Sequence, residues 1–362
     1  MRSGRLDGGL ENLCGACIHL KLFDSYCEFM VTVFSSSELR DLGVGADTFD
    51  ECIGRIRRGW FVLKKPCENT AHEVLHEIHE ASGHPYPQTF GDIRDSTEQL
   101  KTLIRSYARE LLPGSFFSHV SAAIIHGLDP PFPTTTAAEL IRSGYGKRKQ
   151  TVHYRNREVG PDDRARVGDL PVTSMRRTLL DLAHDYPSDV SVPFISQALR
   201  EGKVSKTSLE SGIRLGGRGG RNAQLALELA SPLHESAGEA LCAVRFHRFG
   251  ITGMITQVDS FDASGSWIAR NDFRHETLPL VVEFHGLGKY FLNEGGPDRA
   301  SAKNHERHMK LLNSGLRVFN LVWGDLFRAQ PFMEIKAELK ALASSRSPLG
   351  IETATSARRS RR

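Results

Sequence analysis

Residues 267–284, WIARNDFRHETLPLVVEF, contain two apolar stretches separated by a short polar segment. Trp267–Phe273 and Leu278–Phe284 predict the two strands of a hairpin, with its turn at residues 275–277. The flanking sequence predicts a helix from Ser236 to about Arg248, a strand at Met254–Val258, a basic helix from about Arg299 to Leu312 and a strand at Leu316–Val322. The predicted order of elements is therefore α-β-β-β-α-β.

Two carboxylates lie in the predicted hairpin, and their placement depends on the length of its turn. If residues 276 and 277 form a two-residue turn, Asp272 lies opposite Val281, and Glu283 is the diagonal neighbour of Asp272 on the same face. His285 shares this face. A turn that differs by one residue would put Glu283 on the opposite face of the sheet.

Carboxylates are the ligands that a catalytic magnesium ion needs for phosphodiester hydrolysis. Asp272 and Glu283 are therefore candidate Mg²⁺ ligands, and Lys289 is a candidate source of positive charge near the leaving oxygen. A second interpretation stays open, because acids at strand ends are often solvated. Glu239, three residues after Ser236, also fits a helix capping box.

Residues 30–65 form a second segment of interest. Ser35–Ser37 offer an N-cap for a short helix at Glu38–Leu42, and apolar spacing predicts a second helix over residues 49–58, ended by Gly59. A strand at Trp60–Leu63 follows, which completes the outline of a winged helix-turn-helix. The candidate DNA phosphate contacts are Arg55, Arg57, Arg58, Lys64 and Lys65. The alternative is a small helical hairpin with a solvated basic edge.

Length and composition predict a mixed α/β multidomain protein. The expected divisions are a mobile leader (1–29), the winged helix-turn-helix (30–65), a linker or insertion (66–100), a middle α/β region (101–215), the C-terminal α-β-β-β-α-β domain (222–343) and a disordered basic tail (344–362).

Other histidines and cysteines have open interpretations. Cys14 and Cys17 form a CxxC without a second pair, so we expect a mobile leader and not a zinc site. His72, His76 and His79 share one helical face, but alternating Glu residues favour an exposed polar helix over a metal site. His119 and His126 are expected to be hydrogen-bonded core histidines.

Net charge and hydrophobic pattern bear on the partners and the cellular location of the protein. The net charge is only +4, so total charge argues weakly for a nucleic-acid partner. The absence of a long apolar run or a secretory signal predicts a cytoplasmic protein with reduced thiols and no membrane partner.

Several motifs resemble known families. The run SPLHESAGEAL (231–241), NDF (271–273), VVEFHGLGKY (281–290) and VFNLVWGDL (318–326) resembles actinobacterial domains related to very-short-patch-repair endonucleases, of the PD-(D/E)xK restriction-endonuclease-like fold. FSSSELRDLGV (34–44) with RIRRGWFVL (55–63) resembles the winged helix of AbiEi-type antitoxins of type IV toxin–antitoxin systems, and SHVSAAIIHGL (118–128) with PVTSMRRTLLDLA (171–183) resembles their middle region.

The resemblance implies that Glu239, Asp272 and Glu283 match the acidic, metal-binding positions of the nuclease fold. It also exposes a departure, because His285 stands where the nuclease pattern has Lys. A neutral imidazole stabilises negative charge less well than an ammonium, although it can act as a base or ligand.

Three functions follow as hypotheses. The favoured one is a DNA-binding regulator of the antitoxin type, with a cognate toxin or its target nucleotide system as a further partner. The second is a Mg²⁺-dependent endonuclease or nickase, and the third is a non-enzymatic protein-interaction module with a degenerate nuclease fold. The sequence specifies no DNA target and no oligomeric state.

Overall fold

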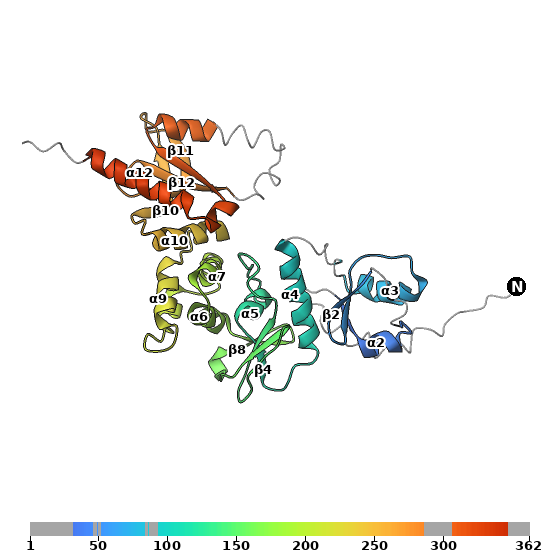
Figure 1. Cartoon of the computed structure of the whole chain (residues 1–362). Coiled ribbons are helices and arrows are strands. Elements are labelled where there is room, and N and C mark those ends of the chain that lie inside the picture. Colours follow the sequence, from blue (N-terminus) through green and yellow to red (C-terminus); the bar gives the residue numbers. More distant parts are fainter. Residues whose placement is uncertain are drawn as a thin grey trace, which may run out of the picture. The chain divides into compact units, whose positions relative to one another are not determined.

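The computed structural model describes residues 32–45, 49, 52–83, 86, 93–285 and 306–346. The chain divides into two compact units, Met1–Glu228 and Leu229–Arg362, each of which is described by itself (Figure 1). Within the described ranges, no helix is long and apolar enough to cross a membrane. The predicted leader at residues 1–29 and most of the predicted tail lie outside the described residues.

The N-terminal part of the first unit contains a three-stranded antiparallel sheet with strand order β1-β3-β2. Its described elements are β1 (Val33–Ser35), α2 (Ser36–Asp41), β2 (Ile53–Arg57), β3 (Trp60–Leu63), η3 (Thr70–His72) and α3 (Glu73–Ala81). A capping box begins α2: the Glu38 N–H donates to Ser35 Oγ at 3.2 Å, and the Ser35 N–H donates to Glu38 Oε2 at 2.7 Å. The first predicted helix is therefore present, two residues earlier than expected.

The helix predicted over residues 49–58 is wrong, because Ile53–Arg57 form strand β2. Gly59, with φ +78°, makes the tight turn through which β2 pairs with β3. Gly54 disfavours a helix, and β-branched Ile53 fits a strand. This segment is a basic β-hairpin in the described structure and not a recognition helix.

Residues 66–100, predicted to be a linker or insertion, contain η3, α3 and the first part of α4 (Ile93–Ala108). The prediction of an exposed polar helix in this range is wrong in part, because one side of the segment is buried. His72 is 0% exposed and His79 is 1% exposed, and Leu75 between them belongs to a hydrophobic core with residues of the N-terminal sheet. The segment is therefore an integral part of the N-terminal fold.

The middle of the first unit is a mixed six-stranded sheet with order β6-β7-β5-β4-β9-β8. Its described strands are β4 (Ser115–Phe117), β5 (Ala138–Arg142), β6 (Lys147–Arg148), β7 (Val152–Arg155), β8 (Arg164–Val167) and β9 (Leu170–Thr173). The helices are α5 (His119–Ile125), α6 (Met175–Asp185), α7 (Ser188–Arg200), α8 (Lys206–Glu210) and α9 (Gly220–Leu229), with 3₁₀ turn η4 (Pro161–Asp163). Fully buried Phe117, Leu140 and Leu179 lie in its core.

The second unit has the predicted order of elements among its described residues. It contains α10 (Ala237–Phe249), β10 (Met254–Phe261), β11 (Trp267–His275), β12 (Leu280–His285), a helix at 306–313, β13 (Arg317–Val322), η6 (Trp323–Phe327) and α12 (Gln330–Arg346). The strand order is β10-β11-β12-β13, with β12 and β13 parallel. α12 continues into residues 344–346, which were predicted to belong to the disordered tail.

Helices cover both faces of this sheet. On one face, Phe273 of β11 packs edge-on against Phe246 of α10, with ring centroids 5.0 Å apart. On the other face, Val281 of β12 shares a core with Leu311 from the helix at 306–313. The two faces of the sheet therefore have separate packing environments.

Candidate functional site

Glu239 lies in the first turn of α10 and is 1% exposed. Its carboxylate accepts hydrogen bonds from Ser236 Oγ at 2.8 Å, the Glu235 N–H at 2.9 Å and Gln257 Nε2 at 3.1 Å. Burial raises the pKa of Glu239, and the charge of Asp272 raises it further, against the lowering effect of the hydrogen bonds. The Glu239 N–H donates to Ser236 Oγ at 3.2 Å, so Ser236 caps the helix, and the Glu239 carboxylate lies near a second acid.

Asp272 lies on β11, where β11 and β12 stop pairing. The Phe284 N–H donates to Asp272 Oδ2 at 2.7 Å. On the neighbouring strand β10, Gln257 has φ +56°, an unusual backbone conformation for a residue other than Gly. This local distortion accompanies the side-chain hydrogen bond from Gln257 to Glu239.

Glu283 lies on β12 and is 2% exposed. Its Oε1 accepts a hydrogen bond from Asn271 Nδ2 at 2.8 Å, and its Oε2 forms a salt bridge with Arg307. Arg307 comes from the helix at 306–313, and its side chain is 36% exposed. Glu283 is thus a buried carboxylate whose charge is compensated by a cation from the following helix.

The register of the hairpin differs from the prediction. Arg274, and not Asp272, lies opposite Val281, because the turn is longer than two residues. Pro279 has no N–H to donate to the β-ladder, and His275 Nδ1 accepts hydrogen bonds from the backbone of Thr277 and Leu278. These two features lengthen the turn.

His285 and Lys289 are the remaining predicted residues of this site. His285 Nε2 lies 3.0 Å from Asn320 Oδ1 on β13, so its side chain is tied to the neighbouring strand. Lys289 lies outside the described residues.

The three predicted acids do not converge on one point in this arrangement. Within the described ranges, the carboxylate oxygens of Glu239, Asp272 and Glu283 do not gather within 4.8 Å of one another. Both oxygens of Glu239 and both of Glu283 already have hydrogen-bonding or ionic partners. A shared ion would therefore have to compete with these partners.

The five basic residues predicted to contact phosphates differ in exposure. Arg57 is only 11% exposed: it donates to Ser106 Oγ and Ser106 O of α4 at 2.8 Å each, and to Glu110 Oε2 in the turn after α4 at 2.7 Å. Its guanidinium carbon lies 4.1 Å from the ring centroid of Tyr107. Arg57 is therefore a structural residue that joins the hairpin to α4.

The other four basic residues are more accessible. Arg55, Arg58 and Lys65 are exposed, and Lys64 is half-buried. The Lys64 side chain packs against Gly54, where an added Cβ would lie 2.9 Å from Lys64 Cδ. The hairpin thus presents positive charge while one of its arginines fastens it to the unit.

Comparisons with known proteins assign no family. No protein-family model and no curated protein matches the chain. A crystal structure of the RV2827C protein from Mycobacterium tuberculosis is similar with a TM-score of 0.31 and 13% identity, covering 64% of this chain and 83% of that chain.

The middle region contains a buried polar network around His119, which is 0% exposed and has φ +52°. His119 Nε2 lies 2.9 Å from Asp185 Oδ2, and Arg157 contacts the same carboxylate at 2.7 Å. Burial alone would raise the pKa of Asp185, but these partners hold it well below its usual range. His126 is 2.7 Å from the Thr173 carbonyl. Both histidines are hydrogen-bonded as predicted.

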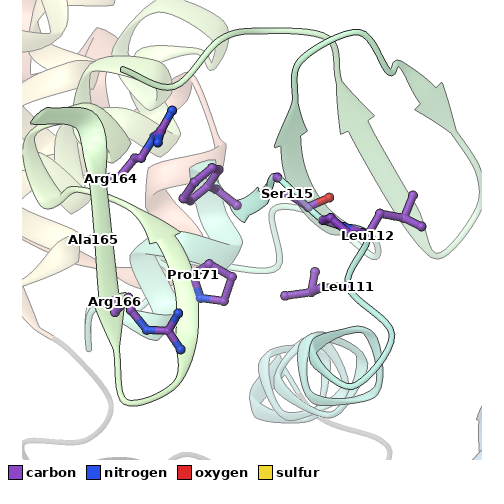
Figure 2. A pocket seen from close by; sticks show the side chains of 10 residues that line it. Leu111, Leu112, Ser115, Arg164, Ala165, Arg166 and Pro171 are labelled. Carbon is purple, nitrogen blue, oxygen red and sulfur yellow. The ribbon is translucent and has the colours of Figure 1, made fainter. Parts of the chain in front are cut away.

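A hollow of 510 Å³ lies elsewhere in the first unit, between the end of α4 and the β8–β9 hairpin (Figure 2). Its lining includes Leu111, Leu112, Pro171, Arg164 and Arg166. Arg166 donates to the Asp169 carbonyl at 2.7 Å, and Arg164 donates to the Val159 carbonyl at 3.0 Å. The hollow contains none of the residues predicted to act in catalysis or DNA binding.

Three residues that contact the acids are not among those predicted from the sequence. Asn271 and Arg307 hold Glu283, and Gln257 holds Glu239. Asn271 directly precedes Asp272 in the quoted NDF motif, and Arg307 belongs to the predicted basic helix. The NDF motif and the basic helix are both visible in the sequence. The pairing of Arg307 with Glu283 depends on how that helix packs across the sheet, which the sequence pattern does not show.

Proposed function

We propose that this protein is a DNA-binding regulator that contacts backbone phosphates through the β2–β3 hairpin. The observation that carries the proposal is the charge of residues 53–65, which contain five Lys or Arg residues and no Asp or Glu. Arg55 and Arg58 are exposed on this hairpin. Clustered cations on a projecting element are typical of phosphate contact, even when total charge is small.

The anchoring of the hairpin supports the same proposal. Arg57 fixes β2 to Ser106 of α4 and to Glu110 in the following turn, so the exposed arginines lie on a held element. A preorganised element loses less conformational entropy when it binds. With β2 as a strand, the proposed contact is made by a hairpin, and major-groove readout by the predicted second helix is no longer part of the proposal.

For the C-terminal unit, we propose a nuclease-like fold that contributes to nucleic-acid contact without cutting. The salt bridge between Arg307 and Glu283 supports this, since it occupies an acid that a metal ion would need. His285 in place of Lys supports it further. An endonuclease would instead nick supercoiled plasmid with Mg²⁺ or Mn²⁺, in a manner abolished by Asp272→Asn.

The proposal is tested by the salt dependence of DNA binding. The Arg55→Ala/Arg58→Ala variant is expected to lose about two units of the log–log slope, because each phosphate contact contributes about 0.9. Lys147→Ala/Arg148→Ala is the matched control, since it removes the same charge from exposed strand β6 of the same unit. An unchanged slope in the hairpin variant, or an equal loss in the control, would contradict the proposal.

A further inference from the structure

Two cysteines and two histidines from consecutive segments of the N-terminal fold lie close together. Cys52 precedes β2, Cys67 follows β3, His72 ends η3 and His76 lies one turn later in α3. The pattern is Cys-x14-Cys-x4-His-x3-His. The strand β2 brings Cys52 into the group, since the Lys64 N–H donates to the Cys52 carbonyl at 2.7 Å, close to Cys67 in the chain.

The sulfur–nitrogen distances within the group are about 0.2–0.5 Å shorter than those between ligands of a tetrahedral metal centre. Cys52 Sγ lies 3.1 Å from His72 Nδ1, Cys67 Sγ lies 3.4 Å from the same nitrogen, and Cys67 Sγ lies 3.2 Å from His76 Nε2. In a tetrahedral zinc site, bonds of about 2.3 Å to sulfur and 2.0–2.1 Å to nitrogen separate these atoms by about 3.6 Å. The ligand atoms of Cys52, Cys67 and His72 all lie within 4.8 Å of one another, whereas His76 adjoins this group through Cys67 and is not within that distance of every member.

Hydrogen bonding alone does not account for this convergence. A histidine ring nitrogen has one proton or one lone pair, so it makes a single good hydrogen bond. Two sulfur atoms nevertheless approach His72 Nδ1, in a place where His72 is 0% exposed. A cation at the centre of the group would contact both sulfurs and the nitrogen at once.

The partner of the second histidine also suits a ligand. His76 Nδ1 lies 2.9 Å from the Tyr86 hydroxyl, which leaves Nε2 directed at Cys67. Metal-bound histidines usually have their other ring nitrogen held by such a hydrogen bond, because it fixes the tautomer and the ring orientation. Cys52 and Cys67 are free cysteines, so both can lose their thiol protons and bind a metal as thiolates.

We propose that Cys52, Cys67 and His72 bind a structural zinc ion, with His76 as the fourth ligand once its ring turns from Cys67 toward the ion. Two sulfur and two nitrogen donors select Zn²⁺ over Mg²⁺ or Ca²⁺, and a complete set of four protein ligands leaves no open position for catalysis. The ion cross-links β2, β3 and α3 around a small core that contains Cys52, Ile53, Leu63 and Leu75. This site does not depend on the proposed DNA-binding function.

The test measures zinc in the full-length protein. Protein reduced with a non-chelating phosphine, loaded with zinc and desalted, is expected to retain about one equivalent by mass spectrometry of the metal. Cys67→Ser and His76→Asn are expected to lose it. The control Cys242→Ser alters a buried cysteine of the other unit, and Cys14→Ser/Cys17→Ser removes the CxxC; both are expected to retain the ion.

Cobalt provides a readout that does not depend on variants. The wild-type protein loaded with Co²⁺ is expected to show strong visible absorption of tetrahedral thiolate coordination and a sulfur-to-metal charge-transfer band. Wild-type protein that retains no zinc, or a cobalt spectrum of weak octahedral type, would overturn the proposal even if every variant unfolds. Retention of zinc by both Cys67→Ser and His76→Asn, or its loss on removing Cys14 and Cys17, would also overturn it.

Discussion

Replacing Arg57 with Ala separates a structural arginine from the arginines proposed to contact DNA. The substitution removes two hydrogen bonds to Ser106, which is 0% exposed, and the salt bridge to Glu110, whose side chain is 54% exposed. Each hydrogen bond from a charged donor contributes about 1.5–3 kcal/mol, and the exposed salt bridge at most about 1 kcal/mol. The cation–π contact with Tyr107 adds about 0.5–1 kcal/mol.

These contributions are not additive, so we expect Arg57→Ala to lower the local free energy of unfolding by about 4 kcal/mol. The measurement is hydrogen exchange by mass spectrometry on peptides from β2, β3 and α4, because it reports local opening in the full chain. A loss of 4 kcal/mol corresponds to exchange faster by roughly three orders of magnitude, or to complete loss of protection where local stability is lower.

Arg58→Ala is the matched control, since Arg58 is the exposed neighbour of Arg57. Its effect on the free energy of local opening is expected to lie within about 0.5 kcal/mol. Arg57→Lys keeps the charge but not the planar fork, so it is expected to lose most of the same protection. The reasoning would be refuted if Arg57→Ala and Arg58→Ala changed exchange equally, or if Arg57→Lys exchanged like the wild type.

Two further predictions concern buried ionisable groups. Arg307→Ala leaves the carboxylate of Glu283 buried without its cation, so we expect a loss of about 3–5 kcal/mol in the free energy of unfolding, measured by chemical denaturation. Adding Glu283→Gln to this variant is expected to recover most of the lost stability. No recovery would contradict the role of the pair. Burial lowers the pKa of His126 below 6.5, so the unfolded state binds more protons and stability falls as the pH drops below 6.5. His126→Gln should flatten this part of the stability profile, and an unchanged profile would assign it to other groups.

The C-terminal elements were predicted well because local signals mark their ends. Ser236 caps α10, with the Glu239 N–H donating to its Oγ at 3.2 Å, and Gly250 ends the helix with φ +64°. Both residue types are selected by the backbone conformation at these places. The turn before β12 was mispredicted because Pro279, which cannot donate a ladder hydrogen bond, was counted as part of a strand.

The N-terminal hairpin was mispredicted because short apolar patterns fit both a helix and a strand. Cys52, Ile53 and Ile56 match helical spacing, whereas Gly54 and the Gly59 turn favour the strand that forms. Pairing with β3 decides the outcome, and pairing is a tertiary interaction that a local window does not contain.

That misprediction also concealed the cysteine–histidine group. Cys52 and His72 are 20 residues apart, and on a helix Cys52 would have had no reason to meet Cys67. Once residues 53–63 form a hairpin, the two ends of the hairpin come together, and Cys52 and Cys67 lie just beyond those ends. The spacing of the histidines is visible in the sequence, but Cys52 adjoins a segment whose predicted structure is wrong.

The two proposals converge on how β2 is held. The proposed zinc ion would fix the beginning of the strand through Cys52, while Arg57 fixes its end to α4. Arg55 lies between these anchors, and Arg58 directly follows the second one. If both proposals hold, removing zinc should weaken DNA binding by loosening the hairpin, yet leave the slope of its salt dependence nearly unchanged, because no phosphate contact is deleted. A parallel loss of slope and affinity on zinc removal would instead mean that the hairpin no longer forms.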